Sequence, residues 1–105
     1  MKPEFENIIL HKNQDQKRFE LEVNNFIAFI DYKETENHIA LIHTESPAEL
    51  SGTGAASALV EKTLVYIKES GKKVLPYCPF VFAYIKKHPE WKTIVDEHFN
   101  GYDQL

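Results

Sequence analysis

Hydrophobic and polar residues alternate along three successive segments in the first half of the chain. Residues 18–23 and 38–44 place apolar side chains at every second position, and residues 26–33 are rich in aromatic and β-branched side chains. These patterns predict three β-strands. The segments are joined only by Asn24-Asn25 and by residues 34–37. Because such short connections cannot cross over a sheet, we expect an antiparallel meander.

The third of these strands carries a histidine within its alternating pattern. Strict alternation places Ile39, Leu41 and His43 on one face of the strand, and Ala40 and Ile42 on the other. The pattern therefore predicts that His43 shares the face of its two apolar neighbours.

The period changes after the loop at residues 46–54. Apolar side chains recur at helical spacing from Ala56 to Ile67, and Gly71 follows as a typical helix terminator. Residues 72–76 then predict a short strand. Since that strand returns through a helical crossover, we expect it to lie parallel to the third strand.

Two further helices are indicated near the end of the chain. One begins near Pro79 and is interrupted by Pro89, and residues 91–95 predict a last short helix. The order β-β-β-α-β-α predicts an α+β fold with a mixed, mostly antiparallel sheet and helices packed on it. We expect one domain over residues 1–105, with its core at about residues 10–98. One stripe of the helix after Pro79 would present Val81, Tyr84, Ile85 and His88.

Composition and charge exclude several classes of protein. With 43% hydrophobic and 27% charged residues, the 105-residue chain reads as a folded globular domain rather than a disordered one. A net charge of −4 provides no positive field for nucleic acid or for an anionic membrane. The first residues lack the apolar stretch of a secretory signal, and no apolar run approaches the ~20 residues of a membrane span. A single cysteine, Cys78, cannot form an internal disulfide, so we expect a cytoplasmic protein.

A glycine-containing loop, Ser51-Gly52-Thr53-Gly54, stands between the third strand and the following helix. Glycines allow a ligand to approach the backbone, and the free amides at a helix start favour a pyrophosphate. The lysine of a P-loop is missing, which disfavours a nucleoside triphosphatase. The flanking meander does not support a dinucleotide-binding βαβ unit. A tight turn without any ligand is the simpler alternative.

Longer stretches of the sequence carry a resemblance to a known family. Residues 43–50, the glycine loop, residues 57–60 and residues 76–91 resemble the small Gcn5-related N-acetyltransferase-like (GNAT) family. In larger members the loop reads Gln/Arg-x-x-Gly-x-Gly/Ala. Here Gly54 and Ala56 match, but Ser51 replaces the basic or amide residue. The replacement removes one side-chain contact to a pyrophosphate and leaves the backbone contacts in place.

The resemblance implies that acetyl-coenzyme A is a substrate and that an amine, on a small molecule or a protein, is the acceptor. It also implies that the third strand diverges from the strand at Val74–Leu75, with the pantetheine arm between them. We expect no metal, because His11, His38 and His98 lack the spacing of a metal site. The expected coenzyme-binding residues are Ile42, Thr44, Ser51, Gly52, Thr53, Gly54, Ala55, Ala56, Ser57, Cys78, Pro79, Phe80, Tyr84, Lys87 and His88.

Four residues are candidates for the chemistry of acetyl transfer. His43 and Glu45 close the third strand, and either can accept a proton from the amine, although a packed histidine and a solvated carboxylate are the ordinary alternatives. Cys78 precedes a helix N-terminus and can be an acetyl-carrying nucleophile, a proton donor or a buried packing residue. Tyr84 matches the family tyrosine that protonates the thiol, or is a core aromatic residue.

These residues support an N-acetyltransferase in which the amine attacks the thioester directly. The alternative is a non-catalytic module that binds or senses acyl-coenzyme A, because residues 1–17 are too few for the N-terminal helix pair that builds the acceptor wall in larger members. A cysteine hydrolase using Cys78 with His43 lacks an oxyanion signature. Lys86, Lys87 and His88 suit either a 3′-phosphate or a solvated helix end.

Overall fold

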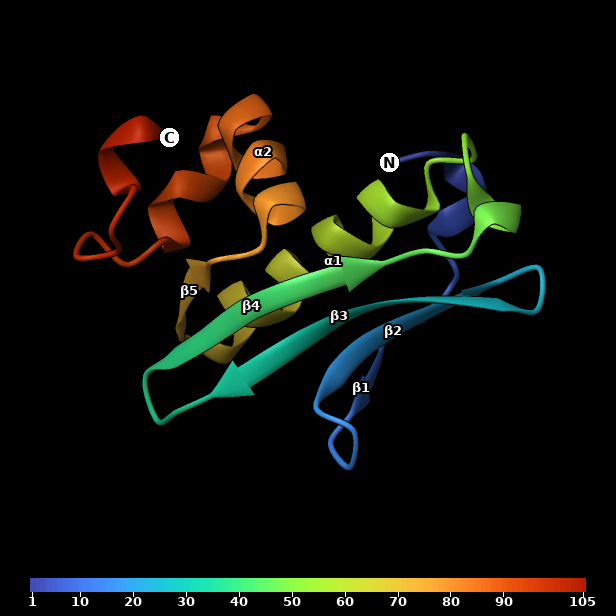
Figure 1. The fold of residues 1–105 in the computed structure, drawn as a ribbon, viewed down its shortest axis with the longest axis horizontal. Coiled ribbons are helices and arrows are strands. Elements are labelled where there is room, and N and C mark those ends of the chain that lie inside the picture. Colours follow the sequence, from blue (N-terminus) through green and yellow to red (C-terminus); the bar gives the residue numbers. More distant parts are fainter.

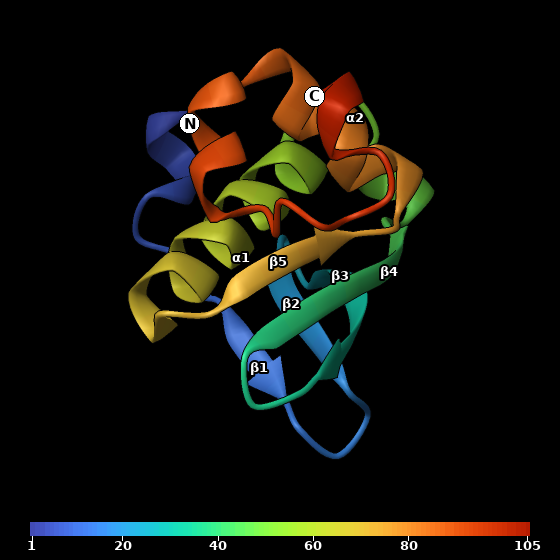
Figure 2. The same ribbon diagram turned by 90° about the vertical axis from the view of Figure 1, so that its left-hand side faces the viewer.

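The computed structural model describes residues 1–105 as a five-stranded sheet with its helices on one side (Figure 1, Figure 2). The sheet order is β1-β2-β3-β4-β5, antiparallel throughout except for the parallel pair β4–β5. This arrangement confirms the α+β class with a mixed, mostly antiparallel sheet. The strands are β1 (His11–Asn13), β2 (Arg18–Val23), β3 (Phe26–Glu34), β4 (His38–Glu45) and β5 (Lys73–Pro76), and the helices are α1 (Ala55–Ser70) and α2 (Pro79–Lys87).

Local turn signals act where the sequence predicts them. Asn24 and Asn25 both have positive φ, +52° and +69°, and join β2 to β3 in a tight hairpin. Gly71 ends α1 in the left-handed region, with φ +78°. Pro79 is the first residue of α2. Strand β1 was not predicted, because its three residues are all polar; it pairs with the edge of β2.

The core lies between α1 and the helix-facing side of the sheet. Phe19, Ile30 and Leu41 from three neighbouring strands are fully buried there. The predicted stripe of α1 is buried from Leu59 to Ile67, including Thr63, whose hydroxyl donates to the Leu59 carbonyl, whereas Ala56 at its start is only partly buried. The core extends closer to the N-terminus than the sequence indicates, since the side chain of Phe5 is only 2% exposed.

The C-terminal segment differs in part from the predicted short helix. A 3₁₀ helix spans Pro89–Ile94, but Val95 is extended and forms a parallel bridge with Val74. The Asp96 amide donates to the Val74 carbonyl at 3.2 Å. The chain therefore covers the free edge of β5, and Val95 is a sheet residue rather than a helical one.

A charge network at the end of β3 gives a pH-dependent stability prediction. Lys12 and Lys72 each place an ammonium group 2.6 Å from the Glu34 carboxylate, and these contacts hold the pKa of Glu34 below its usual range. Because the pKa of Glu34 is lower in the folded protein, its ionised carboxylate stabilises the fold at pH values above the ordinary pKa of glutamate. This stabilisation is lost as the pH falls through the lowered pKa. We expect Glu34→Gln to lower the free energy of unfolding by about 1 kcal/mol at neutral pH.

Urea denaturation from about pH 7 down to about pH 3.5 tests this prediction, because the difference from wild type should shrink over that interval. The exposed Glu36, changed to Gln, is the matched control. A difference that stays constant with pH would contradict the assignment.

Candidate functional site

A β-bulge interrupts the alternation of side chains along strand β4. His43 pairs with Asp31 and Leu41 pairs with Tyr32, which leaves Ile42 as the extra residue. The side-chain alternation therefore reverses after Leu41. As a result, His43 lies on the face opposite to Leu41, and the expectation that both share one face is wrong.

The bulge sorts the last residues of β4 between the two faces of the sheet. Thr44 pairs with the fully buried Ile30 and so faces the helices. His43 and Glu45 lie on the opposite, open face, with side chains 56% and 60% exposed. Their Nε2 and Oε1 atoms are 3.4 Å apart. This exposure argues against a packing role for His43, whose imidazole lies next to the Glu45 carboxylate at the surface.

Beyond Leu41, β4 no longer pairs with β5. The last strand pair joins Leu41 to Pro76, and the Cys78 amide then donates to the Leu41 carbonyl at 2.8 Å. No backbone hydrogen bond links residues 42–45 to β5 or α2. The edge of β4 is free here, as expected from the family resemblance, and across it Thr44 Oγ1 lies 3.2 Å from Cys78 Sγ. Cys78 itself is 3% exposed.

The glycine loop exposes a group of unused backbone donors. Gly52 and Gly54 have φ of +77° and +89°, values that favour glycine. The Thr53 hydroxyl donates to the Leu50 carbonyl and accepts from the Ala55 amide, which holds the loop closed. The amides that donate no hydrogen bond within the protein are those of Gly52, Gly54, Ala56 and Ser57. Together with the dipole of α1, these donors provide the kind of environment that favours an anion.

A cavity of about 430 Å³ opens directly on this loop and reaches the start of α2 at Phe80. The loop residues that line it have small side chains, which would allow a ligand such as a diphosphate to approach the backbone. Seven of the expected coenzyme-binding residues meet here. The lining residues are Ser46, Pro47, Ala48, Leu50, Ser51, Gly52, Gly54, Ala55, Ala56, Ser57 and Phe80.

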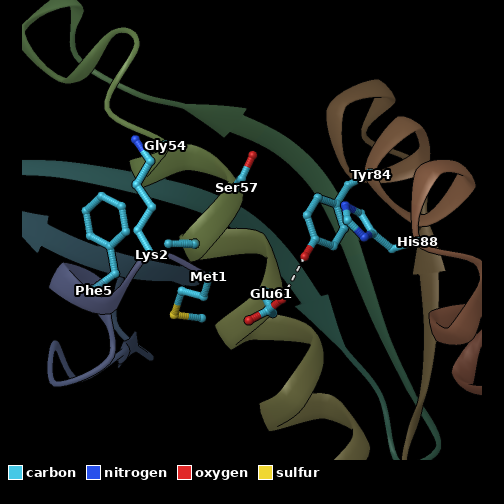
Figure 3. A pocket seen from close by; sticks show the side chains of 9 residues that line it. Met1, Lys2, Phe5, Gly54, Ser57, Glu61, Tyr84 and His88 are labelled. Atoms are coloured by element: carbon cyan, nitrogen blue, oxygen red, sulfur yellow. Dashed lines mark hydrogen bonds between the residues drawn. The ribbon is translucent and has the colours of Figure 1, made fainter.

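Tyr84 is directed to α1 instead of β4. Its hydroxyl donates to the Glu61 carboxylate at 3.0 Å, within a second cavity of about 370 Å³ that shares Gly54 and Ser57 with the cavity on the glycine loop (Figure 3). Burial raises the pKa of Tyr84, and the hydrogen bond to Glu61 raises it further. The phenol is therefore a poorer acid than usual, and its proton is already held by a carboxylate.

The two expected coenzyme-binding residues at the end of α2, Lys87 and His88, are placed differently. His88 lines the same cavity as Tyr84, and the two ring centroids are 4.3 Å apart. Lys87 is exposed and lines neither this cavity nor the one on the glycine loop. Two residues of this cavity were not predicted from the sequence: Glu61, which lies one helical turn after Ser57, and Lys2.

Comparison with known protein families identifies the class of protein to which this fold and loop belong. A family model described as GCN5-related N-acetyl-transferase matches residues 18–101. The chain therefore belongs to the GCN5-related N-acetyltransferase family, which confirms the resemblance. This membership supports a general acyltransferase function, and members of the family normally use acetyl-coenzyme A. No individual curated protein sequence matches the chain.

Two further features bear on the site. No three His, Cys, Asp or Glu side chains are grouped so that they could hold a metal ion. None of the helices has the length and apolar character needed to traverse a membrane.

Proposed function

We propose that this protein is an N-acetyltransferase that binds acetyl-coenzyme A and transfers its acetyl group to an amine by direct attack. The observation that carries the proposal is the set of four free amides on the glycine loop, which open onto a cavity next to the unpaired edge of β4. The free amides could donate hydrogen bonds to a pyrophosphate, and the unpaired strand backbone beside them could pair with the amides of the pantetheine arm.

The residues around the cavity divide the binding task. The amides of Gly52, Gly54, Ala56 and Ser57 would hold the pyrophosphate. The free edge at Ile42 and Thr44 would pair with the pantetheine arm, as an added strand pairs with a sheet edge. When bound, the coenzyme supplies an acetyl thioester, the activated form of the acyl group.

The open face of the sheet supplies the base. An amine that approaches from this face meets His43 and Glu45, either of which can remove its proton while the new N–C bond forms. A free backbone amide of residues 42–45 would donate to the carbonyl oxygen as negative charge develops there. As the C–S bond breaks, the thiolate takes a proton, and we favour Cys78 over Tyr84 as its donor because the Tyr84 hydroxyl donates to Glu61.

A non-catalytic acyl-coenzyme A binding module is the second candidate. It is favoured by the open surface around the two candidate bases, because the side chains of His43 and Glu45 are 56% and 60% exposed and the helices lie on the other side of the sheet (Figure 2).

Turnover separates the two candidates. Calorimetry measures binding of coenzyme A, and thiol release from acetyl-coenzyme A with a panel of amines and peptides measures transfer. Binding with amine-dependent release supports the acetyltransferase. Binding without release from any acceptor supports the binding module, and absence of binding would contradict both.

The role of Cys78 gives a further prediction. Its burial and its 3.2 Å contact with Thr44 favour a proton donor or packing residue over an acetyl carrier. We therefore expect Cys78→Ser to retain much of the activity, because a hydroxyl fills the same space and also donates a hydrogen bond. Intact-protein mass spectrometry after a brief pulse of acetyl-coenzyme A should show no acetyl adduct. An adduct on wild type that is absent from Cys78→Ala and discharged by amine would contradict direct attack.

Two properties outside the site stay predictions. The lone thiol supports a cytoplasmic location, and the net charge of −4 supports the expectation that neither nucleic acid nor an anionic membrane is a partner.

A further inference from the structure

The N-terminal segment places a lysine on the glycine loop. Phe5 is buried in the core and anchors a 3₁₀ turn, in which its amide donates to the Lys2 carbonyl at 3.0 Å. The Lys2 side chain runs past the Phe5 ring toward Gly54 (Figure 3). There, Lys2 Nζ donates to the carbonyl oxygen of Thr53 at 2.8 Å. The burial of Phe5 in the core thus brings the ammonium group of Lys2 to the glycine loop.

The loop has no cation of its own. Residues 46–61 contain no lysine or arginine. Lys2 makes no ion pair with any carboxylate, and Thr53 occupies only one of its three donor positions. An ammonium group with two unused donors therefore lines the same cavity as Gly54 and Ser57, whose amides are two of the four free donors.

We propose that Lys2 is a coenzyme-binding residue, whose ammonium group contacts the pyrophosphate together with the loop amides. The proposal rests on the proposed function. The geometric support is the closeness of Lys2 to Gly54. A Cβ atom added to Gly54 would lie 3.4 Å from Lys2 Cε and 3.5 Å from Lys2 Nζ. Lys2 lies outside residues 18–101, which the family model matches, so this charge is supplied by a part of the chain that the family comparison does not describe.

Calorimetry with coenzyme A and Lys2 variants separates the effect of the ammonium charge from that of the hydrogen bond to the Thr53 carbonyl. Lys2→Gln keeps a donor for the Thr53 carbonyl but removes the charge, and we expect its Kd to rise roughly tenfold at low salt. Lys2→Arg should restore most of the affinity. Lys62→Gln is the matched control, because Lys62 donates to the Glu6 carbonyl on the same N-terminal segment, away from the loop. The difference between Lys2→Gln and wild type should shrink as salt is added.

Truncated ligands locate the contact. Dephospho-coenzyme A lacks the 3′-phosphate and should show the same loss with Lys2→Gln, whereas pantetheine lacks the pyrophosphate and should show none. Equal binding of coenzyme A by Lys2→Gln and wild type would overturn the proposal and leave the acetyltransferase function standing. A loss that disappears with dephospho-coenzyme A would also overturn it, since the contact would then be to the 3′-phosphate. A wild-type protein that binds no coenzyme A would remove the proposed function itself, and this proposal with it.

Discussion

Replacing His43 and Glu45 together, as His43→Gln with Glu45→Gln, should lower kcat/KM for acetyl transfer by about 10²–10⁴-fold. This is the range expected when a general base is lost and an amine must be deprotonated by water. Both side chains are more than half exposed on the open face, so the double variant should fold normally. Coenzyme affinity should be unchanged, because the cavity on the glycine loop includes neither residue.

The single variants identify which residue is the base. The one that accepts the proton should account for most of the loss, while its partner, 3.4 Å away, should have a smaller effect through orientation and charge. Glu22→Gln is the matched control, since Glu22 is an exposed carboxylate on the same open face. Steady-state kinetics at saturating acetyl-coenzyme A make the comparison. A double variant with wild-type kcat/KM would exclude both residues as the base.

Gly54→Val should weaken coenzyme A binding at least tenfold and leave the overall fold in place. Gly54 has φ +89°, where a β-branched residue is strained, and the added Cβ would lie 3.6 Å from the Phe5 ring. Relief of that strain moves the peptide groups on either side of residue 54, one of which carries the free Gly54 amide. Lost charge-assisted hydrogen bonds of this kind cost about 1–3 kcal/mol.

Gly71→Val provides the control for backbone strain. Gly71 has a similar φ of +78°, and nothing lies within 4 Å of its Cβ position at the far end of α1. Both variants should therefore lose stability in thermal melts, but only Gly54→Val should lose coenzyme affinity in calorimetry. A folded Gly54→Val protein that binds coenzyme A as wild type does would exclude the glycine loop as the pyrophosphate site.

Much of the fold follows from short stretches of sequence. The asparagine pair Asn24-Asn25, Gly71 and Pro79 each act through the conformational preferences of single residues, and the structure places a turn, a helix end and a helix start at these positions. The apolar periods of β2 and α1 likewise indicate which side of each element is buried. The glycine loop belongs to this group, because its strand-to-helix position predicts free amides.

The arrangement of the site depends on contacts that no local pattern describes. The bulge at Ile42 reverses the alternation of β4 and puts His43 on the open face, and the bulge becomes visible only in the register against β3. Tyr84 has the spacing of a family proton donor, yet its hydroxyl meets Glu61 because α1 packs beside α2.

Lys2 shows most clearly what only the tertiary structure decided. Its ammonium group bonds to Thr53, a residue 51 positions away, because Phe5 is buried in the shared core. Periodicity in a sequence reports the burial of one element at a time, since it reflects the environment of successive residues. Contacts between distant segments depend on how those buried faces pack together. The glycine loop and the strand and helix that flank it were therefore predictable from the sequence, whereas the residues that pack against the loop, such as Lys2, were not.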